Sequence, residues 1–270
     1  MLLKNLIKNT PKDNKKINIS GLAVNSKDVK KNFIFFAIKG NKLNGEDYII
    51  DAIKNGASVI ICSKNCKFKD KKTTIIKTDK IRDLLSEISS KFYRLKPKNI
   101  IAITGTNGKT SVADLFYQIF KINKKPVASI GTLGVKYNNK IIKTGLTSPD
   151  TIEIHKYLYF LKKKKIDNVI IEASSHGLDQ KRLHHINFKA AVFTNFSQDH
   201  LDYHKTMNSY LNAKLILFKK ILNKKSKIIS DKHIQPYKNL ILIEKKKKIK
   251  ILNIDKEIET LKLENSPKSN

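Results

Sequence analysis

The strongest pattern along the chain is a short apolar run, followed by a polar loop and then by an apolar helical stripe. Residues 100–103 are apolar and rich in β-branched side chains, which predicts a buried strand. Residues 104–108 are small, polar and carry two glycines, a composition typical of a tight loop. Residues 112–120 repeat their apolar side chains at helical spacing. The sequence therefore predicts a strand, a glycine loop and a helix in direct succession.

Residues 1–96 are predicted to form a first, small α/β domain. Strands are expected at 33–38, 57–62 and 73–77, and helices at 48–54 and 81–93. Because a proline disfavours helical geometry in the residue before it, Pro97 marks the end of this domain.

Residues 97–270 are predicted to form a second domain in which strands and helices alternate. After the opening strand, further strands are expected at 127–130, 168–172, 190–194 and 227–230, helices at 152–163 and 210–222, and a hairpin turn at 137–140. This alternation predicts a mostly parallel sheet with helices on both faces, whose ligands bind at the carboxyl ends of the strands. The charge run at 244–250 is expected to be a solvated turn, and residues 264–270 a frayed end.

Length and composition are those of a globular protein. With 270 residues and 40% hydrophobic side chains, the chain is long enough for two cores. The sequence has no apolar run near the roughly 18 residues of a membrane span and no apolar secretion signal at its start, so we expect a cytoplasmic protein without a membrane partner. Cys62 and Cys66 are the only cysteines, and we expect reduced thiols, with Cys62 in the core, rather than a zinc site.

The formal net charge of +32 is typical of a protein with a polyanionic partner. The basic residues are almost all lysine, however, because Arg82, Arg94 and Arg182 are the only arginines. Proteins that read nucleic acids use arginine for bidentate contacts, and lysines spread through the whole chain favour compositional drift over a binding surface. A nucleic-acid partner is therefore the less favoured interpretation.

The glycine loop has the chemistry of a phosphate-binding site. The residues concerned are Gly105, Thr106, Asn107, Gly108, Lys109, Thr110 and Ser111. Backbone N–H groups at a helix N-terminus face an anion, Lys109 supplies positive charge, and Thr110 can ligate Mg²⁺. The loop is shorter than the common P-loop, because Ile103 stands where its first glycine belongs. The prediction is nucleotide phosphate binding, and the alternative is an ordinary strand–helix turn.

Three further polar residues follow or interrupt apolar elements. Glu172 ends a predicted strand, where a Mg²⁺ ligand belongs in a protein with a phosphate loop, although it could instead cap the next helix. His200 follows another predicted strand, among further acidic and histidine side chains, and suits a metal or a structural role equally. Lys214 interrupts an apolar helical pattern, which by itself predicts a side chain that extends to solvent.

Four ordered stretches together resemble the Mur ligase family. They lie at residues 104–110, 172–182, 194–204 and 212–214 with 217–218. The string Glu-x-Ser-Ser-His-x-Leu-x-Gln-x-Arg that begins at Glu172 is most similar to the MurE-type branch, the UDP-N-acetylmuramoyl-dipeptide:amino-acid ligases. Residues 25–27 and 40–48 resemble the family's UDP-binding segments, and 147–150 its substrate loop, so the resemblance covers about residues 20–230.

The resemblance implies a UDP-binding domain followed by an ATPase domain of a peptidoglycan ligase. Such an enzyme uses ATP to add the third amino acid, meso-diaminopimelate or L-lysine, to UDP-N-acetylmuramoyl-L-alanyl-D-glutamate through an acyl phosphate. The implied cofactors are ATP, two Mg²⁺ ions and a CO₂-derived carbamate on Lys214, and a monomer is favoured. The family also has a C-terminal domain that binds the amino acid. We expect this chain to stop before that domain, which leaves open whether it is active alone.

The resemblance also assigns roles to individual residues. Lys109, Glu172, His200 and Lys214 become catalytic, with Thr110 and Glu172 at one Mg²⁺ and His200 and the carbamate of Lys214 at the second. An ammonium would repel Mg²⁺, whereas a carbamate is an anionic oxygen ligand. The side chains implied to hold the UDP-sugar peptide are Ser26, Thr147, Ser148, Ser174, Gln180 and Arg182.

Some positions depart from the family pattern. Lys27 stands where the family often has Arg, and Asn25 and Asn44 stand where Asp is common, which weakens the assignment of the uridine site. One alternative is a module that binds nucleotide and UDP-sugar without catalysis. Another is a relative of folate-polyglutamate ligases, which the pair Gln180 and Arg182 and the first domain disfavour.

Overall fold

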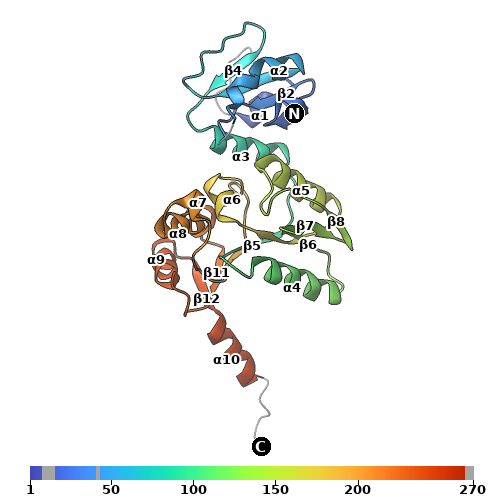
Figure 1. Ribbon diagram of the computed structural model, residues 1–270. Helices are drawn as coiled ribbons and strands as arrows, with labels where there is room; N and C mark the ends of the chain where they lie inside the picture. The colour runs from blue at the N-terminus through green and yellow to red at the C-terminus, as the bar shows by residue number, and fades with distance from the viewer. Residues whose placement is uncertain (8–15, 41–42, 265–270) are drawn as a thin grey trace, which may run out of the picture. The chain divides into compact units, whose positions relative to one another are not determined.

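The computed structural model describes residues 1–7, 16–40 and 43–264, which fold as two units (Figure 1). The first unit is Met1–Arg94 with Thr151–Lys156, and the second is Leu95–Asp150 with Tyr157–Asn270. The sequence analysis placed residues 151–156 in the second domain, but they lie with the first unit. The reason is local packing, because Ile152 is buried in a core cluster of the first unit.

The first unit contains a four-stranded parallel sheet in the order β1-β2-β3-β4. Its strands are β1 (Gly21–Ala23), β2 (Phe33–Phe36), β3 (Ala57–Cys62) and β4 (Thr74–Lys77). Successive side chains of β2 enter opposite core clusters, with Ile34 and Phe36 in one and Phe35 in the other. Because both faces are covered, this strand is a continuous apolar run.

Helices supply the other half of each core in the first unit. They are α1 (Leu3–Leu6), α2 (Ile49–Lys54) and α3 (Ile81–Phe92), with short 3₁₀ turns at Ser26–Asp28 and Gly45–Tyr48. The helix predicted at 48–54 begins one residue later, because Gly45–Tyr48 forms a separate turn. The side chain of Asn44 accepts a hydrogen bond from the N–H of Glu46 at the start of this turn.

Both cysteines are free, and Cys62 is buried, as predicted; Cys66 is buried as well. Cys62 ends β3 and has no exposed surface. Burial raises the pKa of its thiol to about 12. Cys62 is therefore a small core residue.

The cores of the first unit allow a stability prediction with a matched control. Ile34 has no exposed surface, whereas Ile50 in α2 is 55% exposed. We expect Ile34→Ala to lower the free energy of unfolding by about 2–5 kcal/mol because it leaves a cavity, and Ile50→Ala by less than about 1 kcal/mol. Denaturant titration of both variants measures the two losses, and equal losses would contradict this difference in burial.

The second unit contains an eight-stranded sheet in the order β12-β11-β10-β5-β9-β6-β7-β8. Its strands are β5 (Asn99–Thr104), β6 (Val127–Gly131), β7 (Gly134–Tyr137), β8 (Lys140–Ile142), β9 (Asn168–Glu172), β10 (Ala190–Phe193), β11 (Lys227–Ser230) and β12 (Lys250–Asn253). Among the described strands of this sheet, the pairs β6–β7 and β7–β8 are antiparallel, and β7–β8 forms the hairpin predicted at 137–140. The predicted mostly parallel α/β fold is confirmed.

The strand β5 lies between β9 and β10, so the sheet extends in opposite directions from it. Thr104 is opposite Phe193 and Ile103 is opposite Glu172, which brings the carboxyl ends of the three strands to one edge. Such a topological switch point is where open α/β sheets bind ligands. The loops that follow β5, β9 and β10 are therefore placed to form a site.

The helices of the second unit connect these strands. They are α4 (Lys109–Ile122), α5 (Thr151–Lys163), which starts in the first unit, α6 (Ser175–Asp179), α7 (Leu201–His204), α8 (Met207–Ile216), α9 (Tyr237–Lys247) and α10 (Ile254–Glu264). The predicted helix at 210–222 is not regular throughout. After Ile216 it continues as a π turn, Leu217–Ile221, and the N–H of Leu222 bonds to the carbonyl of Leu217.

The charge run at 244–250 is not a solvated turn, so that prediction is wrong. It completes α9 and begins β12. Lys247 Nζ donates to the carbonyl oxygens of Lys219 at 3.0 Å and Leu222 at 2.5 Å, at the end of the π turn. Glu244 Oε1 accepts a hydrogen bond from the N–H of Ile251 at 2.8 Å. These charged side chains satisfy backbone groups, which a count of charges along the sequence does not reveal.

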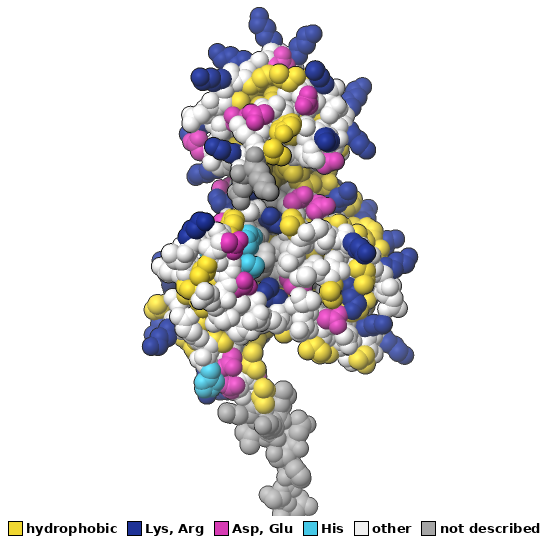
Figure 2. Space-filling model, in the orientation of Figure 1, with side chains coloured by type: hydrophobic (Ala, Val, Ile, Leu, Met, Phe, Trp, Pro, Cys, Tyr) yellow, Lys and Arg dark blue, Asp and Glu magenta, His cyan; other side chains and the backbone are white. Residues whose placement is uncertain are grey.

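Lysine and arginine side chains are distributed over both units on the face shown in Figure 2. Among the described residues, no helix has the length and apolar character needed to cross a bilayer. The frayed end expected at 264–270 lies outside the described residues from residue 265 onward.

Candidate functional site

The glycine loop joins β5 to α4 through two residues with positive φ. Gly105 has φ +152° and Gly108 has φ +80°, which side chains rarely adopt. A Cβ on Gly105 would also lie 1.9 Å from Thr194 Oγ1. Gly108 turns the chain directly into α4, so the helix begins at Lys109 rather than at the predicted residue 112. The first turn of α4 is polar, so the apolar pattern did not reveal it. The N–H groups of this turn lie at the edge of the sheet.

Lys109 lies over this loop. Its Nζ donates to the carbonyl oxygens of Gly105 at 2.9 Å and Thr106 at 2.7 Å. Burial lowers the pKa of Lys109. The ammonium is thus held at the N-terminus of α4, where phosphates bind in loops of this type.

Glu172 ends β9 as a buried carboxylate, with 2% of its surface exposed. Its Oε2 accepts a hydrogen bond from the hydroxyl of Thr110 at 2.9 Å. Its Oε1 accepts the N–H of Thr132 at 3.0 Å. The sequence analysis missed Thr132, although a small polar residue directly after a strand end is the signal it used elsewhere. Thr110 and Glu172 offer hard oxygen donors side by side, which suits Mg²⁺.

Lys214 does not extend to solvent, so the prediction from its helical pattern alone is wrong. The side chain is 1% exposed, because α8 presents it to the glycine loop instead. Its Nζ donates to the carbonyl of Gly105 at 2.7 Å and lies 4.4 Å from the centre of the Tyr210 ring. Burial, and then the charge of Lys109, lower the pKa of Lys214 to about 7.

His200 is the residue immediately before α7 and has a left-handed backbone, φ 52°. Its Nε2 lies 3.4 Å from Asp199 Oδ2. The His200 ring also contacts the ring of His176, with 4.9 Å between the ring centres. Burial lowers the pKa of His176 and of His204. The sequence analysis assigned no role to His176, because side-chain contacts between separate helices leave no periodic pattern.

One cavity of about 260 Å³ brings most of the predicted residues together. Its lining includes Thr106, Asn107, Gly108, Lys109, Thr110, Ser111, Thr132, Thr147, Ser174, Ser175, His200 and Lys214. Glu172 joins this wall through Thr110, and Gly105 joins it through the two lysines that bond to its carbonyl. The cavity is polar, with cationic groups at the glycine loop, and therefore suits an anion.

A second group of predicted residues forms a network beside this cavity. The hydroxyl of Ser148 donates to the backbone carbonyl of Glu172 at 2.8 Å and accepts the N–H of Ser174 at 3.0 Å. Arg182 donates through Nη1 to the carbonyl of Ser148 at 2.7 Å and through Nη2 to Gln180 Oε1 at 2.8 Å. The loop after β8 is thereby tied to the end of β9.

Ser26 lies in the first unit, in a pocket of its own of about 410 Å³. The pocket is also lined by Asn25, Lys27, Gly45 and Tyr48. The Asn25 side chain accepts the N–H of Lys27 at 3.1 Å and so caps the short turn Ser26–Asp28. Asn44 caps the turn Gly45–Tyr48 in the same way. An Asn side-chain oxygen accepts the same backbone hydrogen bond as an Asp oxygen, so these two departures from the family pattern preserve the backbone of both turns.

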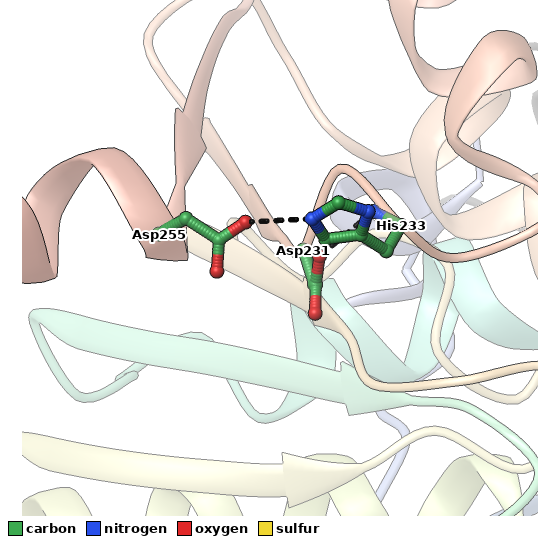
Figure 3. A group of neighbouring side chains, drawn as sticks. All are labelled: Asp231, His233 and Asp255. Atoms are coloured by element: carbon green, nitrogen blue, oxygen red, sulfur yellow. Dashed lines mark hydrogen bonds and ion pairs between the residues drawn. The ribbon is translucent and has the colours of Figure 1, made fainter.

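Another cluster of ionisable side chains lies at the ends of β11 and β12 (Figure 3). It consists of Asp231, His233 and Asp255. His233 Nε2 is 3.4 Å from Asp255 Oδ2, and Lys232 Nζ is 3.9 Å from the same oxygen. These contacts connect the loop after β11 to the first turn of α10. The cluster therefore has a structural role.

The fold and the site define an α/β protein with a glycine loop at the switch point of its sheet. Residues 18–93 match the profile described as "Mur ligase family, catalytic domain", and residues 103–269 match "Mur ligase middle domain". The chain belongs to the Mur ligase family.

The similar curated proteins described next share the name UDP-N-acetylmuramoyl-L-alanyl-D-glutamate--2,6-diaminopimelate ligase. The protein from Rickettsia bellii is 44% identical over 246 residues, which cover 88% of this chain and 49% of that protein. The protein from Brucella melitensis is 39% identical over 208 residues, which cover 77% of this chain and 43% of that protein. The chain thus spans about half the length of the curated relatives it matches.

Solved structures agree with these matches. A UDP-N-acetylmuramoyl-L-alanyl-D-glutamate--2,6-diaminopimelate ligase superposes with a TM-score of 0.81 and 25% identity, over 94% of this chain and 52% of that chain. A MurF ligase from Thermotoga maritima in complex with ADP superposes with a TM-score of 0.57 and 21% identity, over 86% of this chain and 49% of that chain. The second likeness shows a shared fold alone.

Proposed function

We propose that this chain forms the nucleotide-binding and UDP-sugar-binding part of an ATP-dependent peptidoglycan ligase. The enzyme joins an amino acid, diaminopimelate or L-lysine, to UDP-N-acetylmuramoyl-L-alanyl-D-glutamate. The observation that carries the proposal is the single cavity at which Lys109, His200 and Lys214 meet the pair Thr110–Glu172. The names of the similar proteins, which contain diaminopimelate, favour that amino acid.

The residues of the cavity would have different roles in phosphoryl transfer. The N–H groups of residues 108–111 and the Lys109 ammonium would bind and orient the phosphates of ATP, because they lie at the N-terminus of α4. Thr110 and Glu172 would hold one Mg²⁺, which supplies charge neutralisation on the transferring phosphoryl group. The substrate carboxylate accepts that group to form an acyl phosphate, and the amine of the amino acid then displaces phosphate.

Lys214 suits modification by CO₂. Its amine is buried, and its pKa of about 7 leaves a large uncharged fraction at neutral pH. An uncharged amine adds to CO₂ and loses a proton, which gives a carbamate anion. Lys214 and His200 line the same cavity. The carbamate of Lys214 and the His200 ring would together hold a second Mg²⁺.

The remaining predicted residues suit the UDP-sugar peptide. Arg182 has a planar guanidinium that fits a carboxylate or phosphate, and Gln180 and Ser148 fix its orientation. Thr147 and Ser174 lie at the cavity wall, where the acceptor carboxylate must approach the phosphates. Ser26 would bind the uridine end in the pocket of the first unit.

A ligation assay tests the proposal. The protein is supplied with ATP, Mg²⁺, UDP-N-acetylmuramoyl-L-alanyl-D-glutamate and either diaminopimelate or L-lysine, and the amide product and released phosphate are measured. We expect product only when all components are present. Binding of ATP and of the UDP-sugar peptide without product would favour the alternative of a binding module, and absence of both binding events would reject the proposal.

A further inference from the structure

The turn after β6, Gly131–Thr132, holds the Glu172 carboxylate. The backbone N–H of Thr132 donates to Oε1 of Glu172 at 3.0 Å, and its hydroxyl lies 3.1 Å from Oε2. One residue therefore contacts both oxygens of the carboxylate. Because the oxygens are held from two directions, the carboxylate has one orientation relative to the cavity that Thr132 also lines.

The residue before Thr132 has to be small for this contact to form. A Cβ added at Gly131 would lie 2.0 Å from Oε1 and 2.4 Å from Cδ of Glu172. A side chain at position 131 would therefore displace the carboxylate. The two neighbouring residues thus act on the same group, Gly131 by leaving space and Thr132 by donating hydrogen bonds.

The donors that reach Glu172 from Thr132 and Thr110 are neutral. They orient the carboxylate without adding a positive charge that would compete with a metal cation. A hard divalent cation prefers such an anionic oxygen in a fixed position. The geometry is therefore suited to a cation rather than to a permanent ion pair with lysine or arginine.

Thr132 also reaches the loop that carries Thr147. Its hydroxyl lies 3.1 Å from the hydroxyl of Thr147, the same distance as from Glu172 Oε2. A hydroxyl has one proton, so it donates to Glu172 or to Thr147 at any moment. The Thr132 hydroxyl therefore lies between the Glu172 carboxylate and the loop that carries Thr147.

We propose that Thr132 is a positioning residue that sets the orientation of the Glu172 carboxylate for the divalent cation of ATP and connects it to Thr147. This inference rests on the proposed function, because the cation is the one that accompanies the nucleotide there. Thr132→Val removes the hydroxyl at nearly constant volume, and Thr132→Ser keeps it. Thr260→Val is the matched control, since the Thr260 hydroxyl donates only within α10, to the carbonyl of Lys256.

The test measures binding of Mn²⁺ and ATP to the chain, with free Mn²⁺ followed by electron paramagnetic resonance. We expect Thr132→Val to weaken Mn²⁺ binding in the presence of ATP about tenfold, because it removes a hydrogen bond to a charged group. Thr132→Ser and Thr260→Val should bind within about twofold of the unmodified chain. Adding Thr132→Val to Glu172→Gln should cause no further loss, because Thr132 acts through Glu172. Unchanged binding by Thr132→Val, or full additivity of the two losses, would overturn the proposal.

A second measurement needs no ligand. The free energies of unfolding of Thr132→Val, Glu172→Gln and the double variant form a cycle, and we expect the two single losses not to add. Additive losses would overturn the inference whether or not nucleotide binds. Losses that do not add, in a chain that fails to bind Mn²⁺ and ATP, would support the contact between Thr132 and Glu172 and reject the proposed function instead.

Discussion

Lys109→Ala is expected to remove ATP-dependent turnover, with a loss of about 10²–10³-fold in the whole protein. The ammonium of Lys109 is held over the glycine loop by the carbonyls of Gly105 and Thr106, at the start of α4. Alanine removes the positive charge that, in the proposed function, would face the β- and γ-phosphates. Nucleotide affinity by calorimetry and phosphate release in the ligation assay measure the loss.

The same helix supplies the control for this experiment. Lys121 lies near the other end of α4 and is exposed, so Lys121→Ala removes an equal charge without touching the cavity. We expect turnover within about twofold of the unmodified protein for Lys121→Ala. Lys109→Ala with the turnover of this control would refute the phosphate-binding role of Lys109.

We expect Lys214→Ala to lower the ligation rate by a comparable factor. Added short carboxylates should restore part of this rate in the variant. The side chain is buried against the glycine loop, so its removal leaves space near the Gly105 carbonyl. A small carboxylate that enters this space would replace the anionic oxygens of a carbamate. Lys220→Ala, an exposed position on the following π turn, is the control and should show neither loss nor rescue. Failure of rescue in a folded Lys214→Ala variant would count against the carbamate.

Carbamate formation at Lys214 should also depend on pH in a defined direction. Only the uncharged amine reacts with CO₂, and the pKa of Lys214 is lowered from 10.5 to about 7. The uncharged fraction therefore increases as pH rises through about 7, whereas an exposed lysine stays protonated there. Carbon-13 bicarbonate and NMR of the chain should show a carbamate signal that is weak at about pH 6 and strong at about pH 8. A signal that does not change over this range would contradict the lowered pKa.

Much of the fold follows from apolar runs. The predicted strands 168–172 and 227–230 coincide with β9 and β11, because each has a short apolar run at its centre, 169–171 and 228–229, and pairs with a strand on both sides. The start of α4 was missed by three residues, because Lys109–Ser111 is polar and its helical geometry comes from the left-handed Gly108. The irregular π turn after α8 depends on Lys247, which is distant in sequence.

Besides the glycine loop, parts of the candidate site were predictable from polar residues near the ends of apolar strands. Glu172 at the end of one strand and His200 in the polar stretch after another were found in this way, and the structure places Glu172 against Thr110 and His200 at the cavity. Thr132 carries the same signal but belongs to no motif that the sequence analysis recognised. The burial of Lys214 was not predictable from its helix, because the partner that buries it is the glycine loop more than 100 residues earlier.

The two buried thiols allow unfolding of the first unit to be measured separately from unfolding of the second. Cys62 and Cys66 are the only cysteines of the chain, and both lie in the first unit. Alkylating reagents attack the thiolate, and burial of Cys62 makes this form scarce while the first unit is closed. The rate of thiol alkylation therefore measures how often the first unit unfolds, and unfolding confined to the second unit leaves that rate unchanged.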